Sequence, residues 1–425
     1  MADRQDERTV VALDVESPDH ARNWQETGAE LRKCPMAWSS EHGGHWVASR
    51  YKDIVRIVQD EEHFKTGKTF DPATMHVEGG VSIPPMPIGR LVPAETDRPE
   101  WDGFRGLLNP HLGPKAAESY RQRAKGYCAA LIDQVIESGR MDAVEDFTNP
   151  LTAMVTLDLL GFPLAEWRIF ADPLHALTSL AKNDPAYPAA VAAAGVMDLR
   201  IDEEIARRRA HHQDDLIGHL VTAEIDGKPV SHADIHQIIV NVLAGGVDTT
   251  TALTSSVLVY LWKNPEQRRR LAADRGLLPT AREEFIRYFS PLHGSVRTAS
   301  ETSLVDGQTV APGERIYLFL AAANRDPEMF EQPDEVLLDR VPNRHIGFSA
   351  GIHRCVGSFL ARMMFEVMME EILDRLPDYE VIEEGARLYP SVSPVNGWVN
   401  IPITFPPGPK SGLPEPAWLR PIVNA

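Results

Sequence analysis

The sequence contains few cysteines and none in a paired motif. Cys34, Cys128 and Cys355 are the only three in 425 residues, and they are widely spaced. A disulfide framework and a zinc cluster both need closely grouped cysteines, so neither is indicated. This pattern is typical of a reducing compartment, and we expect a cytoplasmic protein.

Basic residues are scarce relative to acidic ones. Lys and Arg number 43 against 61 Asp and Glu, which gives a formal net charge of -18 at pH 7. Because binding to nucleic-acid phosphates requires a basic surface, we expect no nucleic-acid partner.

Long hydrophobic runs without polar residues are absent. The nearest candidate for a membrane span lies between residues 238 and 262, but Asn241, Asp248 and a cluster of threonines would be costly in lipid. We therefore expect no membrane contact and interpret this stretch as a buried central helix.

The chain also lacks repeats, low-complexity tracts and a proline-rich linker. Hydrophobic residues make up 43% and charged residues 24%, close to the averages of folded domains. We expect a monomer with a single domain over 1–425, in which 1–30 is loosely ordered.

Helical periodicity dominates what is present. Apolar residues recur every three or four positions in five stretches, which predicts helices over 116–138, 202–210, 231–263, 280–288 and 356–375. Ser231 is a candidate N-cap for the longest of these, and Asn264-Pro265 is expected to end it.

Strand patterns are short and few. They predict strands at 45–48, within 303–321 and within 392–405, so the fold class is mainly α with a minor β region. The segment 65–99 is rich in Gly and Pro and has little periodicity. It predicts a long irregular loop that lines a binding site.

Cys355 lies in a glycine-bearing loop directly before the predicted helix 356–375. The free amides of a first helical turn and the helix dipole stabilise a thiolate and lower the thiol pKa. Gly351 and Gly357 allow the backbone to approach a flat ligand closely. An isolated cysteine is more often a buried core residue, so the neighbouring residues decide the interpretation.

The segment around Cys355 resembles the haem-binding signature of the cytochrome P-450 family. The matching residues are Phe348, Gly351, His353, Cys355, Gly357 and Ala361. The resemblance extends from Trp46 to Phe405. It implies that family's fold, a triangular helical prism with a long central helix over the haem. It also implies a soluble bacterial haem-thiolate monooxygenase, with haem b as cofactor and Cys355 as the ligand of the haem iron.

The same segment offers a competing motif. Residues 347–351 read GFSAG and fit the G-x-S-x-G nucleophile elbow of serine hydrolases, with Ser349 as nucleophile. That fold needs a strand before the serine, and an acid and then a histidine after it. Only His353 follows, in the same loop, so the order argues against a hydrolase.

Two adjacent glycines, Gly245 and Gly246, fall inside the predicted central helix, where each costs about 1 kcal/mol relative to alanine. Tight helix packing would explain them. The family resemblance instead implies that this stretch passes the haem face. There Thr249 supplies a hydroxyl group and Asp248 relays protons from solvent.

The resemblance also assigns residues around the haem. Arg105, Arg297 and His353 occupy positions that bind the propionates, and Trp101 stands where many members have a histidine. A structural network of Glu284, Arg287 and Arg340 is implied on the side of the cysteine loop.

The implied substrate pocket rests on position within the family alone. Its residues are Asn241, Gly245, Thr249, His293, Val296 and Val395, with the loop 75–90 above them. Asn241 and His293 favour a small hydrophobic substrate with an oxygen function, such as a terpenoid or aromatic compound. The alternative is that both side chains bond to backbone or water.

The resemblance also implies external electron donors. About 70 residues follow Cys355, too few for a fused reductase domain. We expect NAD(P)H to act through a ferredoxin or flavodoxin and its reductase, with O2 as co-substrate. A peroxide-using or gas-binding haem-thiolate protein is the alternative.

Overall fold

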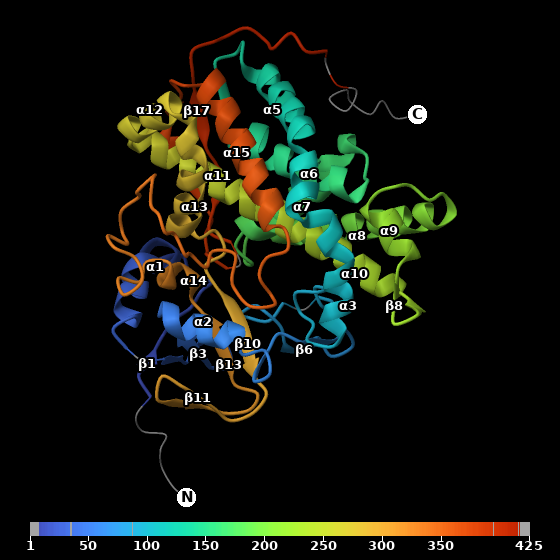
Figure 1. The fold of residues 1–425 in the computed structure, drawn as a ribbon, viewed down its shortest axis with the longest axis vertical. Helices are drawn as coiled ribbons and strands as arrows, with labels where there is room; N and C mark the ends of the chain where they lie inside the picture. Colours follow the sequence, from blue (N-terminus) through green and yellow to red (C-terminus); the bar gives the residue numbers. More distant parts are fainter. Residues whose placement is uncertain (1–7, 35, 87, 394, 415, 417–425) are drawn as a thin grey trace, which may run out of the picture.

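The computed structural model describes residues 8–34, 36–86, 88–393, 395–414 and 416. Helices dominate it and gather at one end, while the main sheet lies at the other (Figure 1). The helices are α1 (Pro18–Leu31), α2 (Tyr51–Gln59), α3 (Glu100–Leu112), α4 (Pro114–Ser119), α5 (Arg121–Val135), α6 (Asn149–Leu160), α7 (Trp167–Ser179), α8 (Tyr187–Ala210), α9 (Leu216–Thr222), α10 (His232–Gly246), α11 (Asp248–Lys263), α12 (Pro265–Ala273), α13 (Leu278–Phe289), α14 (Leu320–Ala323) and α15 (Ser358–Arg375).

The main sheet has six short strands in the order β1-β2-β3-β13-β10-β4. They are β1 (Val10–Val11), β2 (Ala37–Ser39), β3 (His45–Ala48), β13 (Arg315–Leu318), β10 (Ser295–Ala299) and β4 (Phe64–Lys65). Strand β13 runs parallel to β3 and antiparallel to β10, which joins the two halves of the chain. The sheet therefore fixes the N-terminal region against the segment before the cysteine loop.

The remaining strands form small separate sheets. One has the order β14 (Glu380–Val381), β17 (Pro402–Thr404) and β7 (Arg140–Asp142). The others are the pairs β5 (Lys68–Asp71) with β6 (His76–Gly79), β8 (Glu224–Ile225) with β9 (Lys228–Pro229), β11 (Ser303–Val305) with β12 (Gln308–Val310), and β15 (Arg387–Leu388) with β16 (Trp398–Asn400). The predicted fold class, mainly α with minor β, is confirmed.

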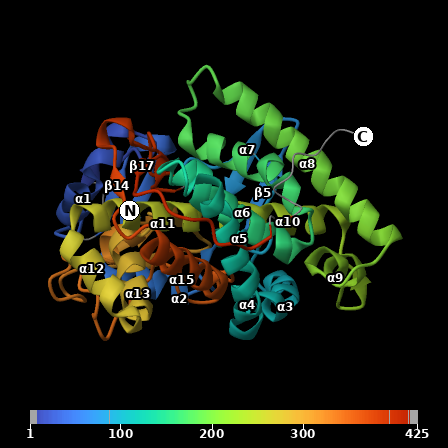
Figure 2. The same cartoon turned by 90° about the horizontal axis from the view of Figure 1, so that it is seen from above.

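The predicted central helix is present but interrupted. Helices α10 and α11 follow each other across the middle of the molecule (Figure 2), with a break at Val247, where φ is -85° and ψ is -66°. The Ser231 side chain accepts a hydrogen bond from the Asp234 N–H, and Asn264 ends α11 as expected. Both predicted helix ends are confirmed.

The two glycines of α10 face different surroundings. A Cβ at Gly246 would lie 2.7 Å from Thr156 Oγ1 on α6, whereas a Cβ at Gly245 would meet no atom within 4 Å. Tight helix packing therefore explains Gly246 only. Gly245 borders open space in the middle of the protein.

Two expectations about loops need correction. We expected 1–30 to be loosely ordered; residues 1–7 lie outside the described residues, but α1 is a helix capped by the Ser17 side chain, with Trp24 and Leu31 buried. The prediction was therefore wrong for 18–30. We expected 65–99 to be irregular, yet β5 and β6 form an antiparallel hairpin inside it.

One helical stretch among the described residues, His232–Lys263, is long and apolar enough to cross a membrane by length and composition. In this fold 67% of its most apolar window is buried inside the protein. A core helix of this length meets the same criteria.

The different surroundings of the two glycines give a stability prediction. Gly246→Ala should lower the free energy of unfolding by about 1–3 kcal/mol, because its methyl group overpacks against Thr156. Gly245→Ala should not lower it and should add up to about 1 kcal/mol, because alanine favours the helix. Urea unfolding measures both. Gly126→Ala on α5, also with no atom near its Cβ, is the control; equal losses at 245 and 246 would contradict the packing difference.

Candidate active site

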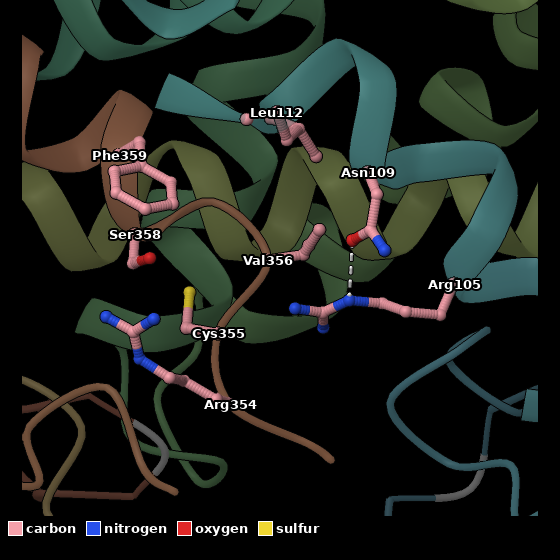
Figure 3. A pocket seen from close by; sticks show the side chains of 9 residues that line it. Arg105, Asn109, Leu112, Arg354, Cys355, Val356, Ser358 and Phe359 are labelled. Carbon is pink, nitrogen blue, oxygen red and sulfur yellow. Dashed lines mark hydrogen bonds between the residues drawn. The ribbon is translucent and has the colours of Figure 1, made fainter. Parts of the chain in front are cut away.

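Cys355 lies three residues before Ser358, the first residue of α15, at the end of the loop that precedes this helix. Its thiol is accessible from a hollow of about 230 Å³ (Figure 3). In that view the guanidinium groups of Arg354 and Arg105 lie on opposite sides of the sulfur. The hollow is lined by Arg105, Asn109, Leu112, Gly113, Arg354, Cys355, Val356, Ser358 and Phe359.

Backbone hydrogen bonds fix the loop that carries Cys355. Its N–H donates to the Phe348 carbonyl at 2.9 Å, and the Ile346 N–H donates to Asn324 Oδ1 at 2.8 Å. Gly351 has φ +68°, and a Cβ there would lie 2.0 Å from the Val58 carbonyl oxygen. Only glycine fits this position, so the motif residue at 351 serves the loop against α2.

The environment of the Cys355 thiol acts on its pKa in both directions. Although the sulfur is accessible from the hollow, the protein atoms around it desolvate it, and this largest influence raises the pKa of Cys355 above its ordinary 9.0. A hydrogen bond from the Gly357 N–H and the nearby charges of Arg105 and Arg354 act to lower that pKa but do not outweigh burial. The start of α15 therefore acts on the thiol pKa in the predicted direction, but desolvation is the larger influence. A coordinated metal ion would supply the remaining stabilisation, because coordination deprotonates a thiol.

The predicted propionate partners converge in the structure. The ring of His353 lies 5.8 Å from that of Trp101, edge to face, and the Arg105 guanidinium lies 5.8 Å from the Trp101 ring. Burial, followed by the charges of Arg297 and Arg105, lowers the pKa of His353 to about 3. The His353 ring also bonds Thr66 Oγ1 at 3.1 Å.

The cations of this group lack carboxylate partners. Arg297 is buried, and its Nη1 donates only to the Val296 carbonyl and Ser295 Oγ. Among the described residues no salt bridge reaches Arg297 or Arg105, and burial lowers the pKa of Arg297 to about 10. The charge of Asp97 acts to raise the Arg297 pKa but does not outweigh burial, and a buried guanidinium without a hydrogen-bonded anion is costly. The donor set therefore fits a haem, whose iron accepts a thiolate and whose two propionates accept guanidinium hydrogen bonds.

The predicted catalytic pair on the central helix points in two directions. Thr249 Oγ1 donates to the Gly245 carbonyl at 2.8 Å, on the open side of the helix. The Asp248 carboxylate is buried on another side, where Oδ1 accepts from the Tyr389 hydroxyl at 2.7 Å and lies 3.2 Å from His175 Nδ1. His175 and Tyr389 carried no sequence signal, since no motif includes them.

The residues predicted to line the substrate pocket have different surroundings in the structure. Asn241 Nδ2 donates to the Val92 carbonyl at 3.0 Å, which is the backbone partner that the sequence left open as an alternative. The His293 ring is fully buried, 4.4 Å from the Trp24 ring, and neither ring nitrogen has a hydrogen-bond partner among the described residues. Val296 and Val395 are buried in apolar clusters. Contact of these residues with substrate stays a prediction.

The network implied on the side of the cysteine loop is present. Glu284, fully buried, accepts two hydrogen bonds of 2.8 Å from the Arg287 guanidinium and one of 2.9 Å from Arg340 Nε. Arg287 Nη1 then donates to the Asn324 carbonyl, and Asn324 Oδ1 holds the Ile346 N–H. A second asparagine just before the loop, Asn343, donates from Nδ2 to Glu284 Oε2 at 3.1 Å. The network therefore reaches the cysteine loop and the segment before it through two asparagines.

Ser349 lacks the geometry of a nucleophile. Its Oγ is buried and has no hydrogen-bond partner among the described residues. The nearby His353 bonds Thr66 instead. A serine hydrolase needs a histidine within hydrogen-bond reach of the serine, so the structure rejects that alternative.

Comparisons with known proteins identify the family of this chain. The family model "Cytochrome P450" matches residues 189–387. Cytochrome P450 130 of Mycobacterium tuberculosis is 31% identical over 345 residues, which cover 80% of this chain and 83% of the relative. The chain belongs to the cytochrome P450 family. It is accordingly a P450 monooxygenase, an oxidoreductase, and the family implies haem iron and the use of O2.

Two further comparisons agree with this P450 assignment. The mycinamicin IV hydroxylase/epoxidase of Micromonospora griseorubida is 33% identical over 337 residues, covering 78% of this chain and 82% of that one. A solved structure of the P450 MycG in complex with mycinamicin IV superposes with a TM-score of 0.80 at 29% identity. It covers 94% of this chain and all of the other. The predicted P450 fold is confirmed.

The buried network gives a second prediction. Glu284→Gln should lower the free energy of unfolding by about 3–5 kcal/mol, because it leaves two buried guanidinium groups without a carboxylate. Urea unfolding of the P450 measures this loss. Glu30→Gln breaks the exposed pair with Lys33 and should cost less than about 1 kcal/mol. Similar losses in the two variants would show that the network does not carry the stability of the loop.

Proposed function

We propose that Cys355 is the axial thiolate ligand of a haem b and that this P450 inserts one oxygen atom of O2 into a small organic substrate. The observation that carries the proposal is the accessible thiol near the buried Arg297 and the half-buried Arg105, neither of which forms a salt bridge among the described residues. When bound, a thiolate-ligated haem supplies the activation of O2 and the transfer of oxygen to the substrate.

The residues of this chain hold the cofactor from two sides. Arg105, Arg297 and His353 bind the propionates, and Trp101 packs beside them. The Phe348 carbonyl, Gly351 and Gly357 keep the loop backbone close enough to aim the sulfur. Arg362 covers the Phe348 ring at 4.5 Å, which holds that ring against α15.

Two side chains of the central helix handle protons. The Thr249 hydroxyl can donate or accept a hydrogen bond on the open side, next to Gly245. The Asp248 carboxylate can take up and release a proton within one residue of that hydroxyl. Adjacent residues of a helix point about 100° apart, so Asp248 faces α7 and Tyr389 while Thr249 faces the open side.

We further propose that separate proteins supply the electrons. A ferredoxin or flavodoxin with its reductase passes them from NAD(P)H to the haem. The alternative, a haem-thiolate protein that uses peroxide or binds a gas, has less use for an acid and an alcohol side by side on the central helix. Comparing product formed with NAD(P)H and partners against product formed with peroxide separates the two.

Binding of carbon monoxide tests whether Cys355 is the ligand of the haem iron. The reduced P450 with carbon monoxide should show a red-shifted Soret band, because thiolate donation changes the haem electronics. Cys355→Ala should lose this band, whereas Cys34→Ala and Ser349→Ala should keep it. An absorption spectrum of haem-loaded wild-type protein without this band would contradict the assignment of Cys355 as the thiolate ligand.

A panel of compounds tests the substrate class. We propose a small hydrophobic substrate with an oxygen function, a terpenoid or an aromatic compound, whose oxygen meets Asn241. Wild-type protein should give Soret shifts with such compounds, and Asn241→Leu should weaken their binding roughly tenfold, the loss of about one hydrogen bond. Fatty acids and a macrolide complete the panel. Identical titrations of both proteins would discard the contact.

A further inference from the structure

The Asp248 carboxylate lies in a buried polar cluster that no sequence motif predicts. Its Oδ1 accepts from the Tyr389 hydroxyl at 2.7 Å and lies 3.2 Å from His175 Nδ1. The Tyr389 hydroxyl is also 3.1 Å from His175 Nδ1. Three elements, α7, α11 and the segment before the β16 strand, therefore meet around a single carboxylate.

The other ring nitrogen of His175 faces outward. His175 Nε2 lies 3.1 Å from the Val399 carbonyl oxygen and 3.7 Å from Glu145 Oε1. The Glu145 side chain is 44% exposed, whereas that of Asp248 is 4% exposed. The imidazole thus spans the distance between a carboxylate in contact with solvent and a carboxylate beside the proposed site.

The charges around His175 keep it able to carry a proton. Burial acts to lower its pKa, but the hydrogen bond to Asp248 and the charges of Asp248 and Glu145 outweigh it, so the pKa stands above its ordinary 6.5. Asp172 on the same helix faces the ring as well. Around Glu145 lie Asp142, Asp172 and Arg168, and burial raises the Glu145 pKa.

We propose that Glu145, His175 and Asp248 form the path by which protons pass from solvent to the active site, with Tyr389 holding the Asp248 carboxylate in place. This inference rests on the proposed function and extends it to residues outside the central helix. Glu145 and His175 are positioning and relay groups, since neither touches the proposed haem site.

Each proton moves between stated atoms. Protonated His175 gives its Nδ1 proton to Asp248 Oδ1 and is left neutral, with the Nε2 proton directed to the Val399 carbonyl. Rotation about Cα–Cβ and Cβ–Cγ then turns the bare Nδ1 toward Glu145, which protonates it and is reloaded from solvent, and the imidazolium turns back to Asp248. Asp248 Oδ2 is buried without a hydrogen-bond partner among the described residues, so the carboxyl group can turn and release the proton from that position.

The same cluster could act only as a clamp. His175 joins α7 to α11 and to Val399 of β16, and losing it would then reduce stability without changing proton transfer. Kinetic isotope effects distinguish the two roles, because a clamp does not move a proton during turnover.

The test uses the haem-loaded protein with NADPH, a ferredoxin and its reductase, and measures O2 reduction in H2O and D2O. His175→Gln keeps a hydrogen-bonding group but cannot carry the proton; it should slow O2 reduction about 10- to 100-fold and raise the solvent isotope effect. His236→Gln is the matched control, since His236 on α10 pairs with Asp198 and Asp202 away from this path. Glu145→Gln, at a half-exposed position, should show a smaller slowing in the same direction and serves if His175→Gln does not fold.

A second readout does not depend on turnover. In the reduced protein with carbon monoxide, NMR of labelled histidine should give His175 a pKa above 6.5 that falls in Asp248→Asn. Unchanged O2 reduction and isotope effect in both His175→Gln and Glu145→Gln, in proteins that keep the carbon monoxide band, would overturn the path and leave the monooxygenase assignment intact. Wild-type protein without that band would instead overturn the proposed function.

Discussion

The buried carboxylate of Glu284 is the interaction on which the position of the thiol depends. It neutralises Arg287 and Arg340 and leaves Arg287 free to hold backbone carbonyls on the far side, including that of Asn324. Asn324 in turn holds the first amide of the cysteine loop. Because a buried ion network has few alternative arrangements, it transmits rigidity rather than flexibility to the sulfur.

The central helix places neighbouring residues in different surroundings. Gly246 packs against α6, Gly245 faces the open side, and Asp248 lies in a buried polar cluster while Thr249 bonds to the Gly245 carbonyl. Successive residues of a helix point about 100° apart, so each of these residues meets a different part of the protein. The same geometry lets acid and alcohol be neighbours in sequence while serving different sides of the helix.

Features that depend on neighbouring residues could be predicted from the sequence, whereas contacts between distant segments could not. The motif at Cys355 and the ends of the central helix at Ser231 and Asn264 follow from residues within one turn of each other. Helix α1 was missed because Trp24 and Leu31 are nearly its only large apolar residues. His175 and Tyr389 lie 73 and 141 residues from Asp248, and only the folded chain brings them together.

The positive charge near the proposed cofactor site contrasts with the negative net charge of the whole chain. The chain carries a net charge of -18, yet Arg105 and Arg297 lie near His353 and form no salt bridge to a carboxylate among the described residues. Burial lowers the pKa of Arg297 to about 10, so its guanidinium stays charged at neutral pH, and lowers that of His353 to about 3, so its imidazole is neutral there. An anionic cofactor would relieve the cost of burying the Arg297 charge, so cofactor binding and the stability of the fold are linked through this side chain.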